Sequence, residues 1–282
     1  MLTTLVRRFD AHISTPRSPQ SLRGIRRFFM EFCMFGIKEA RACLFAGLFF
    51  CALFTSHKLN GWGIPRYDLL LLIAICIQGW MLHAKLETWD EFKAIMVFHV
   101  IGLALEIFKT SMGSWAYPEF AYSKVFGVPL YAGFMHAAVA SYIIQAWRLL
   151  DVRIERHPPY WMAAVIAILI YANFYTHHFI GDYRWHLIAL ACGLYARTTV
   201  MFRPYDRERR MPLLLGFVLI GFFIWIAENI STFMGAWRYP NQIGAWALVH
   251  VGKWSSWSLL AMMTFIIVVE LKHIKERIHI AP

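Results

Sequence analysis

Eight apolar runs, each about as long as a bilayer is thick, constrain this sequence more than any other feature. A membrane-spanning helix needs about 20 mainly apolar residues, and a helix satisfies its own backbone polar groups inside lipid. The sequence therefore predicts an all-α, polytopic membrane bundle of about eight transmembrane helices. The runs lie at residues 36–56, 67–84, 94–112, 128–147, 160–179, 186–202, 212–233 and 246–270.

The composition favours a lipid environment over a soluble fold. Hydrophobic residues make up 59% of the chain and charged residues 16%, whereas soluble domains have about 45–50% and about 25%. The net charge of +11 is scattered between the apolar runs, without a basic stripe or motif. Membrane lipids are therefore the expected partners, and nucleic acid is not.

The distribution of Lys and Arg predicts how the bundle is oriented. With eight spans, the face that carries both termini holds 21 of these residues and the other face holds 7. Because cytoplasmic loops are enriched in Lys and Arg, we expect both termini in the cytoplasm and the chain in the inner membrane of a bacterium.

A repeated motif divides the chain into two halves. Glu106 begins EIFKTSMGSWAYP and Glu228 begins ENISTFMGAWRYP, which share seven of thirteen residues at an offset of 122. We therefore expect two four-helix repeats, at 28–150 and 151–271, between cytoplasmic tails at 1–27 and 272–282. Four spans per repeat give both copies the same direction, so a pseudo-two-fold axis along the membrane normal would relate them.

Glu106 and Glu228 are the first candidate functional residues. A carboxylate inside a transmembrane segment costs roughly 2.5–3.5 kcal/mol on insertion scales, so such a residue usually faces a polar interior. Each could act as a proton donor or base, a metal ligand or a counter-ion. Alternatively, each is a neutral structural Glu, bonded in part to the Thr four residues later. These threonines, Thr110 and Thr232, are also candidate substrate contacts.

The end of the repeated motif, MGxWxYP, has two interpretations. Gly ends a helix and a following Pro prevents its continuation, while Trp and Tyr commonly anchor a helix at the headgroup level. The same side chains could instead contact a substrate. They are Trp115 and Tyr117 in the first copy, and Trp237 and Tyr239 in the second.

A second constellation, THHFIGDYRWH, falls at the predicted outer turn between the fifth and sixth runs. Its imidazoles and carboxylate are suitable ligands for a divalent metal such as zinc or iron, although the spacing fits no motif such as HExxH. Contact with polar headgroups and an interfacial hydrogen-bond network are the alternatives. The candidate metal ligands are His177, His178, Asp182 and His186, with Arg184 as a candidate substrate contact.

Three further histidines, His57, His136 and His250, are predicted near the same outer face. Each alone is a common kind of buried polar residue. Together with His177, His178, His186 and the two glutamates they could form one polar cluster in the outer half of the bilayer, which favours a binding site.

The doubled motif with the intervening THHFIGDYRWH resembles a bacterial membrane family known as domain of unknown function 817. The resemblance covers nearly all of the chain from about residue 28 and implies a membrane location without an assigned reaction. More loosely, Glu and GxWxY patterns in short bundles are similar to membrane carotenoid cyclases and hydratases, in which buried carboxylates are thought to protonate double bonds. The PxEE-type signature of the cyclases is absent here.

These observations favour a membrane-embedded enzyme that acts on a lipid or isoprenoid by acid–base or metal chemistry. Glu106, Glu228, His177 and Asp182 would be its catalytic groups. One alternative is a small transporter, with a polar path to the cytoplasm through His99 and His83. A second is a lipid-binding or assembly protein without chemistry.

Overall fold

The computed structural model describes residues 2–14, 24–56 and 63–280, and most of these residues are helical. The helices are α1 (Leu2–Ser14), α2 (Gly24–Ala42), α3 (Leu44–Ser56), α4 (Arg66–His83), α5 (Trp89–Ser111), α6 (Tyr131–Leu149), α7 (Tyr160–Thr176), α8 (Arg184–Tyr195), α9 (Leu213–Phe233) and α10 (Lys253–Ile280), with the 3₁₀ turn η2 (Pro240–Gln242). The strands are β1 (Lys124–Val125), β2 (Val128–Pro129), β3 (Arg153–Glu155), β4 (Thr199–Phe202) and β5 (Arg209–Pro212). The predominantly helical fold is as predicted.

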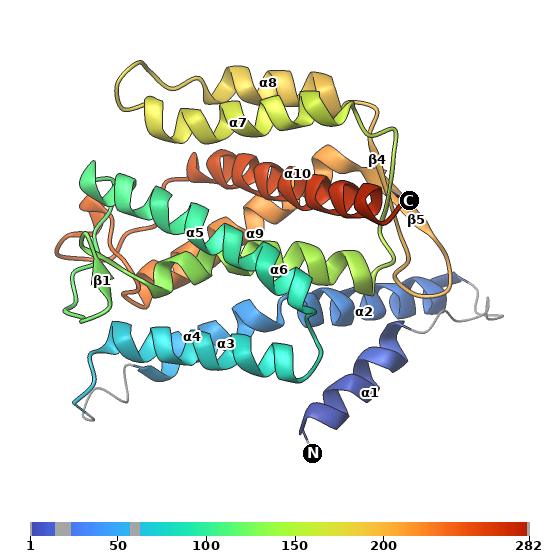
Figure 1. Ribbon diagram of the computed structural model, residues 1–282, viewed down its shortest axis with the longest axis horizontal. Coiled ribbons are helices and arrows are strands. Elements are labelled where there is room, and N and C mark those ends of the chain that lie inside the picture. The colour runs from blue at the N-terminus through green and yellow to red at the C-terminus, as the bar shows by residue number, and fades with distance from the viewer. Residues whose placement is uncertain (1, 15–23, 57–62, 281–282) are drawn as a thin grey trace.

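The long helices lie side by side in layers, with their axes along the same general direction (Figure 1). In this view α7 and α8 form the upper layer, α5, α6, α9 and α10 the middle, and α3 and α4 the lower one. One apolar core fills the space from α5 to α10, and a second joins α3 and α4 to α6. The two ends of the bundle differ, since β1 lies at one end and β4 and β5 lie at the other.

Each of the eight predicted apolar runs overlaps a different helix, from α3 to α10, but the bounds and lengths of the helices differ from the prediction. The first run, 36–56, also includes the end of α2. Within the described residues, two helical segments are long and apolar enough to cross a membrane: Leu213–Phe233 and Lys253–His273. The sixth run, predicted at 186–202, divides into the 12-residue helix α8 and the strand β4. Thr199 and Val200 are β-branched, which favours the extended conformation there.

Helices α5 and α6 pack so closely that no side chain fits between them at two glycines. A Cβ atom placed on Gly102 would overlap the ring of His136, and one on Gly133 would lie 2.7 Å from the ring of His99. Helices α9 and α10 meet in a similar way, because a Cβ on Gly221 would overlap Ser258. Small residues at such crossings let helix backbones approach each other, as in membrane bundles.

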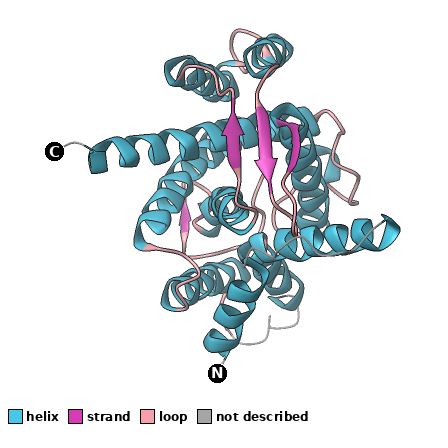
Figure 2. Ribbon diagram, turned by 90° about the vertical axis from the view of Figure 1, so that its right-hand side faces the viewer, coloured by secondary structure: helices cyan, strands magenta, loops and turns pink. Residues whose placement is uncertain are grey.

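A three-stranded antiparallel sheet in the order β3–β4–β5 covers one end of the bundle (Figure 2). Helix α2 is attached to this sheet region by polar contacts. Arg209 Nη2 lies 2.5 Å from Glu31 Oε2, and Lys38 Nζ donates to the carbonyl of Arg203 at 2.9 Å. The basic residues of β5 and of the preceding loop therefore lie at the end of the bundle opposite to β1.

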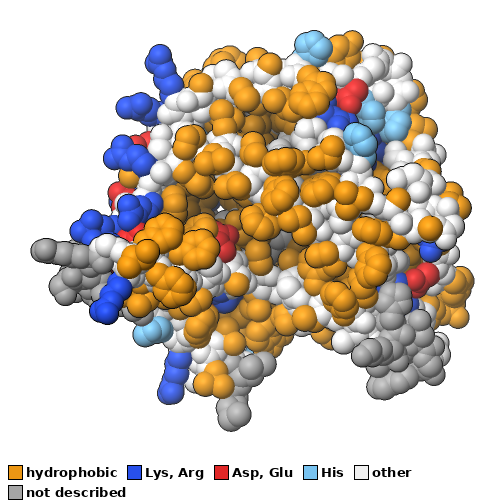
Figure 3. All heavy atoms as spheres, turned by 180° about the vertical axis from the view of Figure 1, so that it is seen from behind, with side chains coloured by type: hydrophobic (Ala, Val, Ile, Leu, Met, Phe, Trp, Pro, Cys, Tyr) orange, Lys and Arg blue, Asp and Glu red, His pale blue; other side chains and the backbone are white. Residues whose placement is uncertain are grey.

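Large apolar side chains cover much of the outer surface of the helices. Phe223 of α9, Ile168 of α7 and Val100 of α5 are each at least 64% exposed. On the face seen from behind, hydrophobic side chains spread over the middle and Lys and Arg side chains gather along one edge (Figure 3). Exposed apolar surface of this extent marks contact with lipid or with another protein.

Candidate functional site

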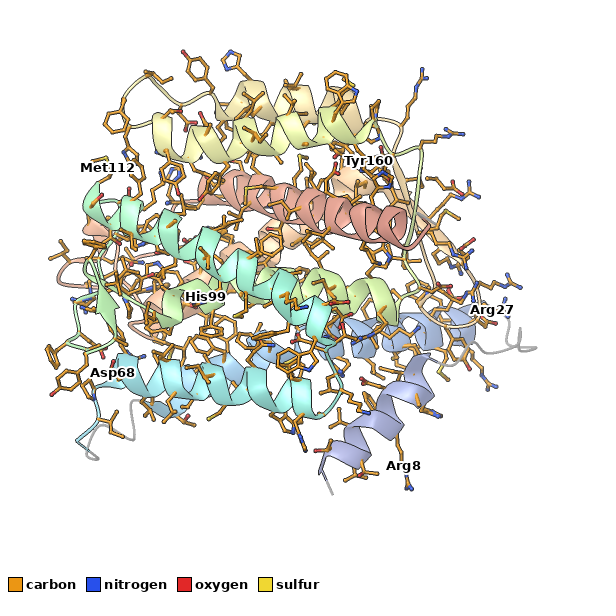
Figure 4. The ribbon with its side chains drawn as sticks, viewed as in Figure 1. Arg8, Arg27, Asp68, His99, Met112 and Tyr160 are labelled. Carbon is orange, nitrogen blue, oxygen red and sulfur yellow. The ribbon has the colours of Figure 1, made fainter. Side chains whose placement is uncertain are left out.

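Glu106 receives hydrogen bonds from three side chains at the β1 end of the bundle. It lies on α5 between His99, in the middle of the bundle, and Met112, at the helix end (Figure 4). Trp115 Nε1 and Tyr117 OH each donate to Oε2 at 2.7 Å, and His136 Nε2 of α6 lies 2.8 Å from Oε1. Glu106 is 5% exposed, so its carboxyl group is shielded from bulk solvent.

A left-handed glycine explains how Trp115 and Tyr117 reach back to Glu106. Gly113 has φ +68°, a conformation that glycine adopts without a steric penalty, and it ends α5. The chain then reverses over the helix end. Gly235, with φ +69°, does the same after α9. The predicted helix stop is present in both copies of the motif.

Glu228 has a related arrangement at the end of α9. The hydroxyl of Tyr239 donates to Oε1, and Trp257 Nε1 of α10 donates to Oε2 at 2.7 Å. Tyr117 and Tyr239 therefore bond to their glutamates in the same way. In both tyrosines, burial and then the nearby carboxylate raise the pKa well above its usual value, so both phenols remain hydrogen-bond donors at neutral pH.

The two copies of the motif contact each other through equivalent residues. Ala116 and Arg238 exchange two backbone hydrogen bonds of 2.9 Å, as in an antiparallel bridge, and their numbers differ by the motif offset of 122. Beside this bridge the ring of Trp115 meets that of Tyr239 edge-on, with centroids 5.9 Å apart. The structure thus brings Glu106 and Glu228 into one aromatic cluster.

Lys253, the first residue of α10, contributes a cation to this cluster. Its Nζ lies 5.0 Å from the ring centroid of Trp115 and 4.8 Å from that of Tyr239. Both rings attract a cation through their π faces. The same ammonium group is within electrostatic range of both glutamates, although it forms no ion pair with either of them.

Arg66 attaches the first half of the chain to the end of α9. Its guanidinium group donates to Ser56 Oγ at 2.9 Å, to the Met234 carbonyl at 2.6 Å and to Glu119 Oε1 at 2.6 Å. Arg66 is 4% exposed. It thereby satisfies carbonyl groups that the end of a helix leaves without intrahelical partners.

The expected bonds between each glutamate and the following threonine are absent. Thr232 Oγ1 donates to the Asn229 carbonyl and accepts from Trp246 Nε1. Thr110 Oγ1 is buried and has no hydrogen-bond partner among the described residues. Donors from the reversed loop and from the neighbouring helices take their place, because a threonine hydroxyl in a helix readily bonds to its own backbone.

The tryptophans and tyrosines of the motif do not use their polar atoms at the headgroup level. Tyr117, Trp237 and Tyr239 are each less than 9% exposed, and the tyrosine hydroxyls bond to the glutamates. These side chains pack inside the protein, and the headgroup-anchor interpretation stays a prediction.

Lys109 lies between two of the predicted metal ligands. Its Nζ is 3.1 Å from His177 Nε2 and 3.0 Å from His178 Nε2, so both imidazoles accept from the ammonium group. Burial, and then for His178 the charge of Lys109, lowers the pKa of each imidazole. The neutral form of both rings is favoured.

The other two predicted metal ligands do not complete a site. Asp182 Oδ2 pairs with Arg184 Nη2 at 2.8 Å, and its backbone and side-chain hydrogen bonds lower its pKa in spite of burial. His186 is exposed. Among the described residues no group of three or more His, Cys, Asp and Glu side chains is arranged to hold a metal. The predicted ligand set of His177, His178, Asp182 and His186 is therefore not assembled, because an ammonium group fills the space between the two imidazoles.

His250 does not join the cluster: it is exposed, and its Nδ1 accepts from the backbone N–H of Gly252. His57 falls outside the described residues. Sequence reasoning missed Lys253 and Trp257, since neither belongs to the repeated motif. Lys109 could have been found, because a charge three residues after Glu106 within an apolar run is itself unusual.

A small cavity adjoins the site on the side of His136. Its volume of about 10 Å³ is room for about one water molecule. Its walls are mostly apolar, and the polar groups among them are the imidazole of His136 and the hydroxyls of Tyr171 and Thr264. The other lining residues are Phe98, Ile101, Gly102, Leu105, Leu260 and Met263. His136 thus connects Glu106 to an apolar space between α5, α6, α7 and α10.

Comparison with known proteins identifies relatives but no activity. The chain is 53% identical over 243 residues to the uncharacterized protein YoaT of Bacillus subtilis (strain 168), a match that covers 86% of this chain and 92% of that protein. No solved structure matches. Residues 31–265 match the model of a family described as protein of unknown function DUF817. The resemblance seen in the doubled motif is therefore confirmed, and the chain belongs to the DUF817 family.

Proposed function

We propose that this chain is an integral membrane enzyme that carries out acid–base chemistry on a lipid or isoprenoid. The observation that carries the proposal is the contact of 2.8 Å between Glu106 and His136 at the wall of an apolar cavity. A buried carboxylate that orients an imidazole is a recurring acid–base pair in enzymes.

Two helical segments are apolar and long enough to cross a membrane, and the proposal adds six further helices, for eight spans in total. Apolar side chains exposed along α5, α7 and α9 support it, as do the basic residues gathered along one edge of the surface (Figure 3). This edge would face the cytoplasm together with both termini, in the inner membrane of a bacterium. The site would then lie in the outer half of the bilayer.

The proposed architecture is a pair of four-helix halves, 28–150 and 151–271, between the tails 1–27 and 272–282. The bridge between Ala116 and Arg238 supports it, since only residues on a local two-fold axis pair reciprocally with their own counterparts. The matching bonds of Tyr117 and Tyr239 to the two glutamates are a second, independent support.

In the proposed chemistry His136 is the group that exchanges a proton with the substrate. With Glu106 ionised, Nε2–H of His136 donates to it and Nδ1 is the basic nitrogen. Glu106 would stabilise the imidazolium that forms. Glu228 accepts hydrogen bonds from Tyr239 and Trp257. Together with Lys253 it would determine the electrostatic potential at the aromatic cluster.

The apolar walls support a substrate with a hydrocarbon segment. Leu260 and Met263 of α10 face the same space as His136. Because this space holds about one water, binding of a lipid requires α7 or α10 to move away from α5. A site that opens between helices would receive its substrate from the bilayer rather than from water.

The proposal is tested by comparing Glu106→Gln and His136→Asn with a matched surface control, Glu155→Gln, an exposed position on β3. Membranes from bacteria that express each protein would be extracted and their lipids and isoprenoids compared by mass spectrometry. We expect a lipid product that is made by the wild type and by Glu155→Gln. In both site variants its amount should fall by at least about a hundredfold, the usual effect of removing a general base. A lipid profile that the wild-type protein does not alter, or that Glu106→Gln alters equally, would contradict an enzymatic role.

Transport is a second candidate, on the observation that His99 Nδ1 is buried without a hydrogen-bond partner among the described residues. His99 lies deeper than Glu106 on α5, and its ring is 4.5 Å from that of Phe134. A proton path towards the basic end would use this atom. The test is whether proteoliposomes that contain the protein acidify without forming a lipid product. Acidification by the wild type that is lost in His99→Phe would favour transport over chemistry.

A further inference from the structure

The strongest unassigned feature is a group of cations at the end of α5, here named the outer cationic cluster: Lys109, Arg184 and Lys253, with His177, His178 and Asp182. Three separate elements contribute its basic residues, namely the last turn of α5, the first residue of α8 and the first residue of α10. Figure 3 shows histidine, basic and acidic side chains gathered on the surface at the edge away from the basic end.

Specific contacts hold the cluster together. Lys109 bonds to His177 and His178, and His177 Nδ1 lies 2.9 Å from the Asn173 carbonyl. Asn173 Nδ2 donates to Asp182 Oδ1 at 3.2 Å. Arg184 then reaches the start of α10. Its Nη1 donates to the carbonyl of Gly252, directly before the helix, at 3.1 Å and to Ser255 Oγ in its first turn at 3.4 Å. These contacts fix the three basic residues relative to one another.

The cluster has more positive groups than acidic partners. Asp182 pairs with Arg184 at 2.8 Å, whereas no carboxylate of the described residues lies within ion-pair distance of the ammonium group of Lys109 or Lys253. The oxygens of Glu106 and Glu228 are already occupied by five N–H and O–H donors. Lys109 is 6% exposed, and the charges of Lys253 and Arg184 repel its ammonium group while that of Asp182 attracts it.

Such an arrangement is costly unless an anion completes it. Buried or half-buried cations that repel one another destabilise the fold, while a polyanionic group between them removes the repulsion and accepts charge-assisted hydrogen bonds. Lys109 uses two of its three N–H groups on the imidazoles and retains one. Arg184 and Lys253 are half-buried, so the cluster is open to a ligand at its surface.

We propose that the outer cationic cluster binds the phosphate group of an anionic ligand, with Lys109, Arg184 and Lys253 as its contacts. This rests on the proposed function and specifies its substrate as an anionic amphiphile, such as a phospholipid or a prenyl phosphate. Lys253 supports the link, because it belongs to the cluster and also lies over Trp115 and Tyr239, which belong to the glutamate site. A bound phosphate thus lies beside the acid–base groups.

The test uses the full-length protein purified in a neutral detergent and measures its melting temperature with added ligand. The probes are phosphatidylglycerol, farnesyl phosphate, inorganic phosphate and, as a neutral comparison, phosphatidylcholine. We expect the anionic probes to raise the melting temperature and phosphatidylcholine not to. Lys109→Met and Arg184→Gln should weaken binding of the anionic probes by roughly tenfold or more.

The matched control is Arg210→Gln, an exposed position on β5 at the opposite end of the bundle; it should retain the full effect. If inorganic phosphate raises the melting temperature as much as the lipids do, the cluster binds free phosphate. That outcome still supports recognition of a phosphate group. Equal stabilisation by phosphatidylcholine, or equal loss in Arg210→Gln and Arg184→Gln, would overturn the proposal.

Two further measurements keep the test decisive. Because Lys109→Met removes a buried charge and could impair folding, Arg184→Gln is measured independently, and the ³¹P signal of bound ligand is followed in both variants. The lipid profile and the phosphate binding of the wild-type protein are measured separately. Phosphate binding without an altered lipid profile would contradict the acid–base proposal alone, and an altered lipid profile without phosphate binding would contradict the binding proposal alone.

Discussion

Gly102 leaves no room for a side chain beside His136, because a Cβ placed on it would lie 2.3 Å from Cβ and 2.5 Å from Cγ of His136. The imidazole of His136 bonds to Glu106. The crossing of α5 and α6 therefore determines where Glu106 and His136, the proposed acid–base pair, lie. Gly102 is needed at this crossing because it has no side chain.

Gly102→Ala should displace His136 and destabilise the protein. Overpacking of a tight interface typically costs about 1–3 kcal/mol, so we expect a loss of that size in unfolding by SDS in mixed micelles. Gly79→Ala on α4 is the matched control, because nothing lies within 4 Å of a Cβ at that position. Equal stability of the two variants would contradict the tight packing.

Tyr117→Phe and Tyr239→Phe should each destabilise the protein by about 1–3 kcal/mol, since each leaves a buried carboxylate oxygen without one donor. The similarity of their bonds predicts losses of similar size. Tyr122→Phe serves as the control, because Tyr122 is 81% exposed. Unfolding in mixed micelles would measure all three, and a loss confined to one copy of the motif would count against an equivalent role.

Arg66→Gln should cost about 3 kcal/mol, because it removes a buried cation from two helix-end carbonyls and from Glu119. We also expect faster proteolysis of the loop after α9, which Arg66 holds. Arg153→Gln on β3, whose side chain is 63% exposed, provides the comparison. No change in proteolysis would mean that other contacts hold this loop.

Stability should fall as the pH decreases from neutral towards pH 5. Burial lowers the pKa of His177 and His178 below the ordinary value of 6.5, with the charge of Lys109 acting in the same direction. The unfolded chain therefore binds more protons than the folded one in this range, and acid favours unfolding. Around these rings Arg184 and Lys253 also oppose protonation and Asp182 favours it.

The measurement for this prediction is the melting temperature as a function of pH in the wild type and in a His177→Gln, His178→Gln variant. Removing both imidazoles should flatten the profile between about pH 5 and pH 6.5. Asp182 does not interfere, because its lowered pKa acts below its ordinary value of 3.8. An unchanged profile in the variant would assign the acid sensitivity elsewhere.

Sequence patterns predicted what depends on neighbouring residues. The apolar runs located a helix in every case, and the glycines of the repeated motif located the ends of α5 and α9, because chain reversal is a local property. The contacts of Trp257 and Lys253 were not predicted, since they depend on how α10 lies against residues more than a dozen positions away. Position 186 was expected beside His177 and His178, but Gly181 and the turn around it direct His186 to the surface.

The bridge between Ala116 and Arg238 has a consequence for the origin of this arrangement. Residues that pair with their own counterparts across an axis are the contacts that two identical subunits make in a symmetric homodimer. If the proposed halves arose by duplication and fusion, the chain keeps such an interface without requiring the two copies to be alike. At the motif offset of 122, the position of His136 corresponds to Ser258. The proposed fusion would then have allowed Glu106 to acquire an imidazole partner while Glu228 has none at that position, an asymmetry that a homodimer of identical chains does not have.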